Sequence, residues 1–272
     1  MDPKPVELNI DRVSRGENPV RFDLLDRALP FRNYHESLLD LIARSGAIDI
    51  CDVGGGANPE LSPAEVAAKG LRYTVVDISA TELAKADPSY TTLVADIAGS
   101  EVISNEAFDL VFSRMLAEHV TDGEAFHRNV FKMLRPNGIA FHFFPTLYAL
   151  PFVLNKLVPE DLGTRVLTVF DRNRDLEGHQ VKFPAHYSWC KGPTPQQIRR
   201  FESLGFEVLD YVGFFGHNGY YRRIPPLLYT HQRISAFLLR RGVSWQTSYA
   251  YLVLRKPAEP RRKEDAAGAA AT

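Results

Sequence analysis

The sequence predicts an α/β fold in which a parallel sheet carries helices on both faces. Short apolar runs typical of strands alternate with amphipathic stretches typical of helices over most of the chain. A glycine-rich segment follows the first of these runs, and acidic residues end the next two. The length of 272 residues suits one large domain or two small ones.

The elements can be placed in order along the chain. The first 45 residues are polar and then amphipathic, and their leucines predict two helices separated by Pro30. The strands expected after them are Ile48–Val53, Tyr73–Asp77, Thr92–Asp96, Phe108–Ser113, Ile139–Phe144, Phe206–Phe214 and Ser248–Arg255. The expected helices are Ser62–Lys69, Ala80–Ala86, Gly123–Leu134, Thr194–Leu204 and Arg222–Arg241. A hydroxyl residue followed by proline begins two of them, which is a favourable helix start.

This order of elements predicts how the chain is divided. Residues 1–45 are expected to form a helical cover, and residues 46–257 the main domain. A lid rich in aromatic residues and proline is expected at 145–192, and a helical insertion at 215–246. The charged and then alanine-rich residues 258–272 are expected to be a disordered tail.

Composition excludes several classes of protein. With 45% hydrophobic and 24% charged residues, the chain is neither a disordered segment nor a collagen-like repeat. Two cysteines are too few for a disulfide framework. The polar N-terminus does not read as a signal peptide, and no apolar run is long enough to span a membrane. We therefore expect a cytoplasmic protein.

Charge is distributed unevenly along the chain. Residues 1–144 hold 14 Lys/Arg and 22 Asp/Glu, a balance of −8, whereas residues 145–272 hold 18 and 11, a balance of +7. Ordinary scatter of surface charge is one interpretation, and a basic half that faces an anionic substrate or membrane is the other. The pI near 6.7 argues against a nucleic-acid partner.

The segment Arg222–Arg241 is the main candidate for such a basic surface. Its apolar residues could share one face while arginines supply the charge, as in helices that lie on anionic lipid. The apolar set is Leu227, Leu228, Ile234 and Leu238, and the basic set is Arg222, Arg223, Arg233, Arg240 and Arg241. Peripheral membrane contact is one expectation, and a helix that closes the active site is the alternative.

A glycine-rich turn follows the first strand of the main domain. In Asp52-Val53-Gly54-Gly55-Gly56, the glycines allow a sharp turn and a close approach of the backbone to a ligand. Ligands of open α/β sheets bind outside the carboxyl ends of the strands, so the position is suitable. Pro59 stands where a dinucleotide fingerprint needs its third glycine, and the sequence contains no P-loop motif.

Two further carboxylates end successive strands. Asp77 ends the second expected strand, where it can accept hydrogen bonds from both hydroxyls of a ribose. Asp96 ends the third, where it can accept from the amino group of an adenine. Each alone could be a solvated strand end, but three acidic strand ends in succession indicate a nucleoside-like ligand.

These segments resemble those of the class I S-adenosylmethionine-dependent methyltransferases, from about Asp49 to Phe144 and from Thr194 to Lys256. The segments that carry the resemblance are Asp52-x-Gly54-x-Gly56, Val75–Ser79, Ala95-Asp96-Ile97, Phe108–Ser113, Glu118-His119-Val120 and Met133–Gly138. The last two expected strands resemble the antiparallel hairpin that closes the sheet of that family. The resemblance implies a Rossmann-like class I methyltransferase sheet with a C-terminal antiparallel hairpin and inserted lid segments.

The resemblance also implies a function and a set of binding residues. The implied reaction is methyl transfer, and the implied cofactor is S-adenosylmethionine. From the sequence as a whole we expect the acceptor to be a small molecule, a glycan or a lipid-linked compound, methylated at oxygen. The cofactor-binding residues expected from the resemblance are Asp52, Gly54, Gly56, Asp77, Asp96, Ile97 and Ser113.

An alcohol acceptor needs a general base, and histidines are the candidates. His119 and His186 are favoured over His142 and His217, because both are expected near the carboxyl edge of the sheet. Met115 stands where the ubiquinone-pathway O-methyltransferases have a glutamate, so no metal site is expected there.

Three other functions remain open from the sequence. They are a cofactor-binding pseudoenzyme that holds a partner, a methyltransferase of nucleic acid or protein, and an NAD-dependent dehydrogenase. The hairpin disfavours the dehydrogenase. The sequence does not indicate an oligomeric state.

Overall fold

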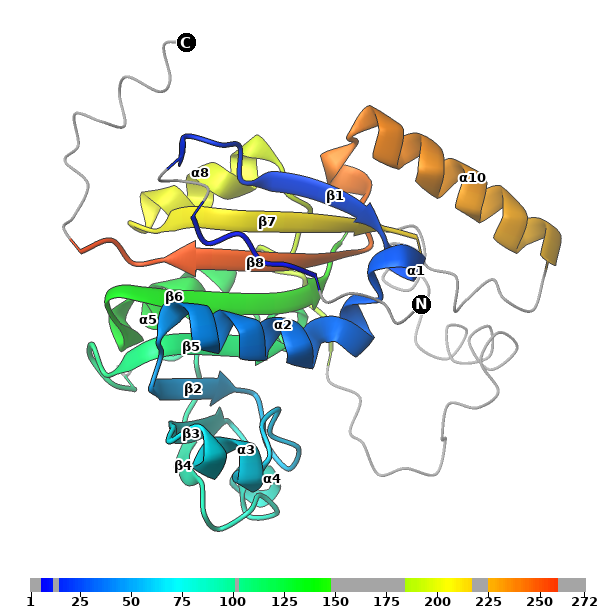
Figure 1. The fold of residues 1–272 in the computed structure, drawn as a ribbon. Helices are drawn as coiled ribbons and strands as arrows, with labels where there is room; N and C mark the ends of the chain where they lie inside the picture. The colour runs from blue at the N-terminus through cyan, green and yellow to red at the C-terminus, as the bar shows by residue number, and fades with distance from the viewer. Residues whose placement is uncertain (1–5, 12–14, 101–102, 148–183, 217–224, 259–272) are drawn as a thin grey trace.

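The computed structural model describes residues 6–11, 15–100, 103–147, 184–216 and 225–258. These residues form an eight-stranded sheet in the order β1-β7-β8-β6-β5-β2-β3-β4, with helices on both faces (Figure 1). Most of the expected lid and nearly all of the expected tail lie outside the described residues. The division into cover, main domain and insertions stays a prediction.

The strands and helices follow the sequence pattern closely. The strands are β1 (Val20–Leu24), β2 (Asp49–Val53), β3 (Arg72–Asp77), β4 (Thr91–Val94), β5 (Phe108–Arg114), β6 (Leu134–Pro145), β7 (Glu207–Phe215) and β8 (Tyr249–Arg255). The α-helices are α1 (Leu25–Ala28), α2 (Pro30–Ser45), α3 (Pro63–Ala68), α4 (Ala80–Leu83), α5 (Gly123–Met133), α8 (Pro195–Ser203) and α10 (Pro225–Arg241). Two short 3-10 helices are η2 (Ala117–His119) and η3 (Ser244–Gln246).

The pairing of the strands confirms the predicted fold class. Strands β2 to β6 run parallel to one another, whereas β8 is antiparallel to both β6 and β7. The β7–β8 pair is therefore the expected antiparallel hairpin. The carboxyl ends of the parallel strands meet at one edge of the sheet, which is where ligands bind in this architecture.

Strand β1 was not expected from the sequence. It pairs in parallel with β7, at the end of the sheet opposite β4. Its Arg21 donates through Nε to Oδ1 of the fully buried Asp210, at 2.9 Å, and the amide of Asn9 donates to Oδ2 at 2.9 Å. The N-terminal region thus contributes a strand to the sheet. The leucines next to it have helical spacing, so the sequence predicted helices here and not this strand of five residues.

Helix α2 packs on one face of the sheet through an aromatic cluster. Its Tyr34 ring stacks on Phe141 at a centroid distance of 5.0 Å and on Phe143 at 5.7 Å, and Tyr251 meets it edge-on at 5.9 Å. The Tyr34 hydroxyl donates to the carbonyl of Ser113 at 3.3 Å. This helix therefore fixes the end of β5, where the sequence places a functional motif.

The opposite face is covered by α5 and α8, and it contains buried histidines. His142 shares a hydrogen bond of 2.8 Å between Nδ1 and the hydroxyl of Ser113, and burial lowers its pKa to about 3. The His127 ring packs against it, with centroids 5.2 Å apart. His142 is therefore a neutral core histidine.

No helix among the described residues is long and apolar enough to cross a membrane.

Candidate active site

The glycine loop after β2 is held against two other segments of the site. The amide of Gly54, at φ +81°, donates to the carbonyl of Val76 at 2.7 Å. A Cβ on Gly54 would lie 2.8 Å from a methyl of Leu116, and one on Gly56, at φ +45°, 3.0 Å from Oδ2 of Asp77. Both positions require glycine, because a side chain would collide with neighbours and would be strained at positive φ. The loop, the end of β3 and the segment after β5 therefore meet at one place.

Asp52 supports this loop from inside the protein. Its side chain is buried, and its Oδ2 accepts the amide of Glu60 at 2.9 Å and the hydroxyl of Tyr73 at 2.7 Å. Burial raises the pKa of Asp52 to about 6, although these two hydrogen bonds oppose the shift. The sequence predicted Asp52 but not Tyr73, whose hydroxyl meets it only because β2 and β3 are neighbours.

Asp77 presents one carboxylate oxygen to the edge of the sheet. Its Oδ1 accepts the amide of Ser79 at 2.8 Å. Its Oδ2 lies beside Gly56 and accepts no hydrogen bond from the residues that the structure describes. A ligand that crosses the glycine loop would therefore find this oxygen available.

Asp96 and Ile97 lie at the next strand end. The amide of Ala95 donates to the carbonyl of Asp77 at 3.0 Å, and Oδ1 of Asp96 accepts the amide of Ala98 at 2.9 Å. Ile97 is buried, and its carbonyl accepts Nδ2 of Asn129 in α5 at 2.9 Å. The sequence predicted this segment but not Asn129, which anchors it from a distant helix.

Ser113 differs from the other expected cofactor residues. Its side chain is fully buried, its hydroxyl bonds to His142, and its carbonyl accepts Tyr34. Its described contacts therefore all lie within the core.

The chain turns sharply after β5 and buries a carboxylic acid. Met115 adopts φ +53°, a conformation that is uncommon outside glycine. Glu118 follows in η2 with 3% of its surface exposed, and its Oε2 has no hydrogen-bond partner in the described structure. Burial raises the pKa of Glu118 to about 8. An unsatisfied buried carboxyl is costly, so its presence here indicates a functional role.

The two predicted bases are brought together around Glu118. The Nδ1 atom of His119 lies 3.1 Å from the carbonyl of Pro184, which can only accept, so Nδ1 carries the proton. Its Nε2 lies 3.7 Å from Oε1 of Glu118. The amide of His186 donates to the Glu118 carbonyl at 2.7 Å, and the His186 side chain is exposed. His217 lies outside the described residues.

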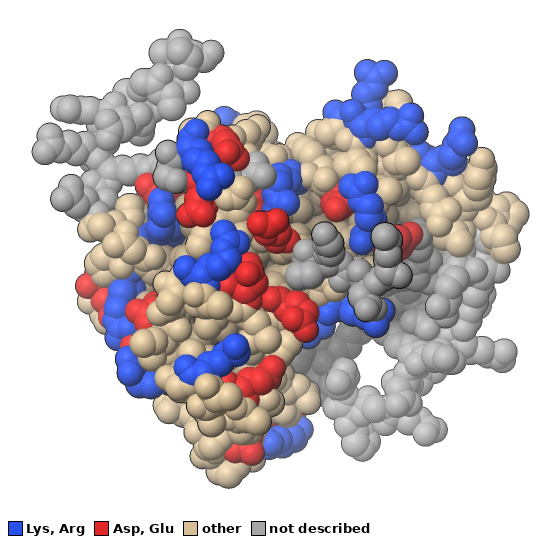
Figure 2. Space-filling view, in the orientation of Figure 1, with Lys and Arg blue, Asp and Glu red and all other residues tan. Residues whose placement is uncertain are grey.

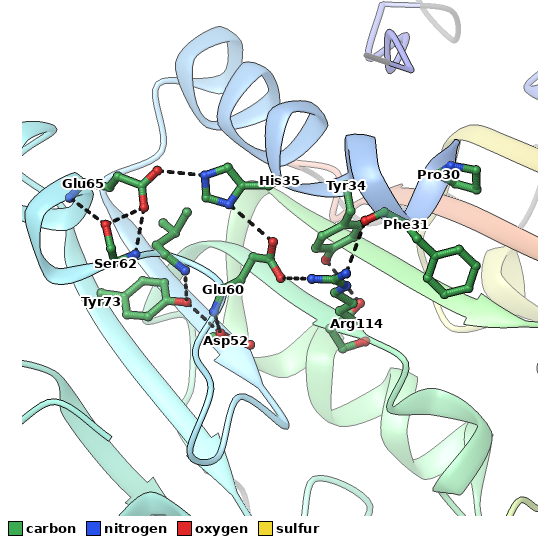
Figure 3. A network of polar contacts seen from close by, with 12 residues as sticks. Pro30, Phe31, Tyr34, His35, Asp52, Glu60, Ser62, Glu65, Tyr73 and Arg114 are labelled. Atoms are coloured by element: carbon green, nitrogen blue, oxygen red, sulfur yellow. Dashed lines mark hydrogen bonds and ion pairs between the residues drawn. The ribbon is translucent and has the colours of Figure 1, made fainter. Parts of the chain in front are cut away.

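A polar network joins α2 to the glycine loop (Figure 3). Arg114, at the end of β5, donates to Glu60 at 2.8 Å and to the carbonyl of Phe31 at 3.2 Å, and its guanidinium lies 5.4 Å from the Tyr34 ring centroid. His35 of α2 lies 3.3 Å from the same Glu60. Sequence reasoning missed this network because its members are far apart in the chain and share no motif.

One cavity among the described residues lies away from this network. It has a volume of about 520 Å³ and is open. It is lined by Lys191, Thr194, Pro195, Gln196, Arg199 and Trp245. None of the expected cofactor residues contributes to it.

Residues 51–142 match a family model described as a methyltransferase domain. The chain carries a class I methyltransferase domain. The matched range includes the glycine loop, Asp77, Asp96 and the Glu118-His119 pair, but not His186 or the α2 residues of the polar network. No curated protein sequence matches the chain significantly.

Solved structures of low sequence identity share the fold of this methyltransferase domain. A putative sarcosine dimethylglycine methyltransferase from Galdieria sulphuraria is 12% identical, with a TM-score of 0.51, over 86% of this chain and 88% of the other. The geranyl diphosphate C-methyltransferase of Streptomyces coelicolor is 12% identical, with a TM-score of 0.51, over 83% and 81%. A putative methyltransferase from Haloferax volcanii, solved with its activator, is 16% identical, with a TM-score of 0.50, over 85% and 93%.

Proposed function

We propose that this domain transfers a methyl group to a hydroxyl oxygen of a small-molecule, glycan or lipid-linked acceptor. The domain match supports methyl transfer as the reaction and S-adenosylmethionine as the cofactor. The fold neighbour from Streptomyces coelicolor was solved with S-adenosyl-L-homocysteine and geranyl diphosphate, a small-molecule acceptor. We also infer that the protein acts in the cytoplasm and not on nucleic acid.

The residues at the carboxyl edge fit an adenosine-containing cofactor. The positive φ angles and close surroundings of Gly54 and Gly56 indicate a loop shaped for close approach of a ligand. The available oxygen of Asp77 suits the hydroxyls of a ribose, and Asp96 and Ile97 are placed for an adenine. When bound, the sulfonium supplies a methyl group and leaves as a neutral thioether.

The observation that carries the choice of an oxygen acceptor is the position of His119, between the Pro184 carbonyl and Glu118. A hydroxyl must lose its proton as its oxygen forms the new bond, and a base contributes about 10²–10⁴-fold to such a step. With Nδ1 against the Pro184 carbonyl, Nε2 is the ring nitrogen of His119 that would accept this proton. Above about pH 8, where the Glu118 carboxyl is ionised, its Oε1 at 3.7 Å from Nε2 would stabilise the resulting imidazolium. His186 is the alternative base, because its backbone touches the same glutamate.

Binding of the cofactor is tested by Asp77→Asn, which removes the charge and keeps the shape. Calorimetry with S-adenosylmethionine should show a ten- to hundredfold loss of affinity, because a hydrogen bond to a charged acceptor is worth about 1.5–3 kcal/mol. The control is Asp40→Asn, which removes an exposed carboxylate of α2 that pairs with Arg44. Equal affinities for the two variants would contradict the assignment of Asp77.

Catalysis is tested by comparing His119→Gln with His186→Gln. Acceptors would first be found by incubating the protein and S-adenosylmethionine with small-molecule and lipid extracts, using mass spectrometry to detect addition of a methyl group. Single-turnover rates should then fall about 10²–10⁴-fold in His119→Gln and much less in His186→Gln, with cofactor affinity unchanged in both. A methyl group found on nitrogen or carbon, or a larger loss in His186→Gln, would contradict the proposal.

A further inference from the structure

Helix α10 leaves large apolar side chains exposed along its length. Leu227 is 40% exposed, Ile234 51% and Phe237 55%. Among the described residues of this helix, only Ser235 is buried. Helix α10 contacts β1 and β7 and lies at that end of the sheet (Figure 1).

These exposed residues share one face of the helix. Residues three, four and seven positions apart are neighbours on a helix surface. Leu227, Ile234 and Phe237 follow this spacing, and Arg241 extends the same face by one further turn. The sequence had grouped Leu227 and Ile234 with Leu228 and Leu238, but the latter two are partly buried, on the side toward Ser235. The outward face is therefore apolar by itself and is not packed on the domain.

The charged side chains of helix α10 itself are all basic. Helix α10 contains Arg233, Arg240 and Arg241 and no acidic residue. No described acidic side chain forms an ion pair with these three arginines. The guanidinium of Arg241 instead lies 5.6 Å from the Phe237 ring centroid. Figure 2 shows basic side chains projecting from this end of the molecule, with acidic side chains visible below them.

The connections of α10 place this face near the cofactor edge of the sheet. Strand β7 is antiparallel to β8, which is antiparallel to β6, so β7 and β6 point the same way. The segment that contains α10 leaves β7 at its carboxyl end and enters β8 at the same edge. A surface bound to α10 would therefore lie on the side of the sheet edge where the glycine loop is found.

We propose that α10 is the surface by which this protein binds reversibly to an anionic lipid membrane. Charge complementarity selects the occupant, because arginines with no ion-pair partner among the described residues attract anionic headgroups while Phe237, Ile234 and Leu227 enter the headgroup–acyl boundary. Trp245, half exposed in η3 just after the helix, adds an aromatic side chain of the kind that favours such an interface. Binding to α10 is independent of the methyl-transfer proposal, since none of its residues belongs to the site.

The test is sedimentation of the full chain with vesicles. Vesicles of phosphatidylcholine with a third of phosphatidylglycerol should bind the protein at low salt, and binding should decline as salt rises. Pure phosphatidylcholine vesicles should bind it weakly. The triple variant Arg233→Gln, Arg240→Gln, Arg241→Gln should bind the anionic vesicles about a hundredfold less, because each charge contributes roughly fivefold near an anionic surface.

A matched control separates this face from basic charge in general. Arg128→Gln removes an exposed arginine of α5 that pairs with Glu124, and it should leave vesicle binding unchanged. Phe237→Ser should weaken vesicle binding by an amount that persists at high salt, since its contribution is apolar. Calorimetry with S-adenosylmethionine should give the wild-type affinity for all of these variants. A loss of vesicle binding can then be assigned to the α10 surface and not to damage at the cofactor site.

Three outcomes would overturn the proposal. The first is a wild-type protein that does not sediment with anionic vesicles at low salt. The second is binding of a single-stranded oligonucleotide in preference to the vesicles, with the same loss in the triple variant. The third is a protein that is dimeric in sedimentation velocity and becomes monomeric through Phe237→Ser, because α10 would then be an interface between two copies of this chain.

Discussion

Helices α2 and α10 are similar in length, and each lies against the sheet, yet they use their apolar residues in opposite ways. Helix α2 buries Tyr34, Leu38, Leu41 and Ile42 on the sheet. Helix α10 buries a single serine among its described residues and exposes Phe237 and its neighbours. Burial of apolar area is the main stabilising contribution in folding, so α2 contributes to the stability of the domain in a way that α10 does not.

The difference in burial between α2 and α10 indicates that the two helices have different roles, one in stabilising the domain and the other in binding. A helix such as α2, which carries an aromatic cluster and a polar network down to the glycine loop, holds the site in shape. A helix such as α10, which is attached by few buried groups, retains its apolar area for contact with something outside the chain. Substitutions in α2 should therefore be measured as changes in stability, and those in α10 as changes in binding.

The largest expected effect is that of Tyr34→Ala. Loss of a fully buried aromatic ring from the α2 cluster should lower the free energy of unfolding by about 3–5 kcal/mol. The matched variant is Phe237→Ala, which removes an aromatic ring from α10 and should change stability by less than about 0.5 kcal/mol. Urea denaturation followed by circular dichroism measures both. Similar losses in the two variants would show that α10 is packed as tightly as α2 and would remove the contrast.

The contrast also explains what could be predicted from the sequence. Helix α2 and the strands are specified by local patterns, such as the apolar spacing around Tyr34, the proline at its start and Gly46 at its end, at φ +68°. The glycine loop and Asp77 were predicted because a motif of adjacent residues encodes them. The partners of these groups were not, because Arg114, Glu60 and Tyr73 meet only after the strands have aligned. A local pattern contains no information about contacts over such distances.

The predictions from the sequence were also incomplete at the end of the sheet where β1 and α10 lie. The amphipathic pattern predicted a helix at α10, but the pattern alone cannot tell a face that packs on the domain from one that faces outward. Strand β1 was missed because its residues alternate over only five positions. Arg21 gives no sign in the sequence that it pairs with Asp210, which lies far along the chain in β7.

A smaller change in the free energy of unfolding is expected for Glu118→Gln. It tests whether a buried side chain always stabilises the protein. The pKa of Glu118 is raised from its usual 4.5 to about 8, so the folded protein keeps a proton that the unfolded chain releases. The stabilisation from this proton is complete below pH 4.5 and is lost as the pH rises to about 8. Glu118→Gln has no such loss and should be more stable than the wild type at pH 8, by about 2–4 kcal/mol.

Thermal unfolding of both proteins across this pH range measures the effect. The two stability profiles should converge at low pH and separate as the pH rises, and parallel profiles would contradict the raised pKa. If Glu118 also stabilises the imidazolium of His119, the more stable variant should turn over more slowly. Glu118 would then be a buried group that serves catalysis at a cost in stability. The exposed face of α10 would likewise serve function, in its case binding, without contributing to stability.

The smallest expected effect on stability is that of Arg114→Gln, at the junction between α2 and the site. The Arg114 side chain is 40% exposed, and a pair of this kind with Glu60 contributes only about 0.2–1 kcal/mol. Cofactor affinity should nevertheless fall severalfold, because Glu60 donates its amide to Asp52 and so links the arginine to the glycine loop. The control Arg128→Gln breaks the exposed pair with Glu124 on α5 and should change neither quantity. Denaturation measures the change in stability, and calorimetry on the same preparations measures the change in cofactor affinity. If Arg114→Gln binds the cofactor as tightly as the control, then α2 supports the fold without shaping the site.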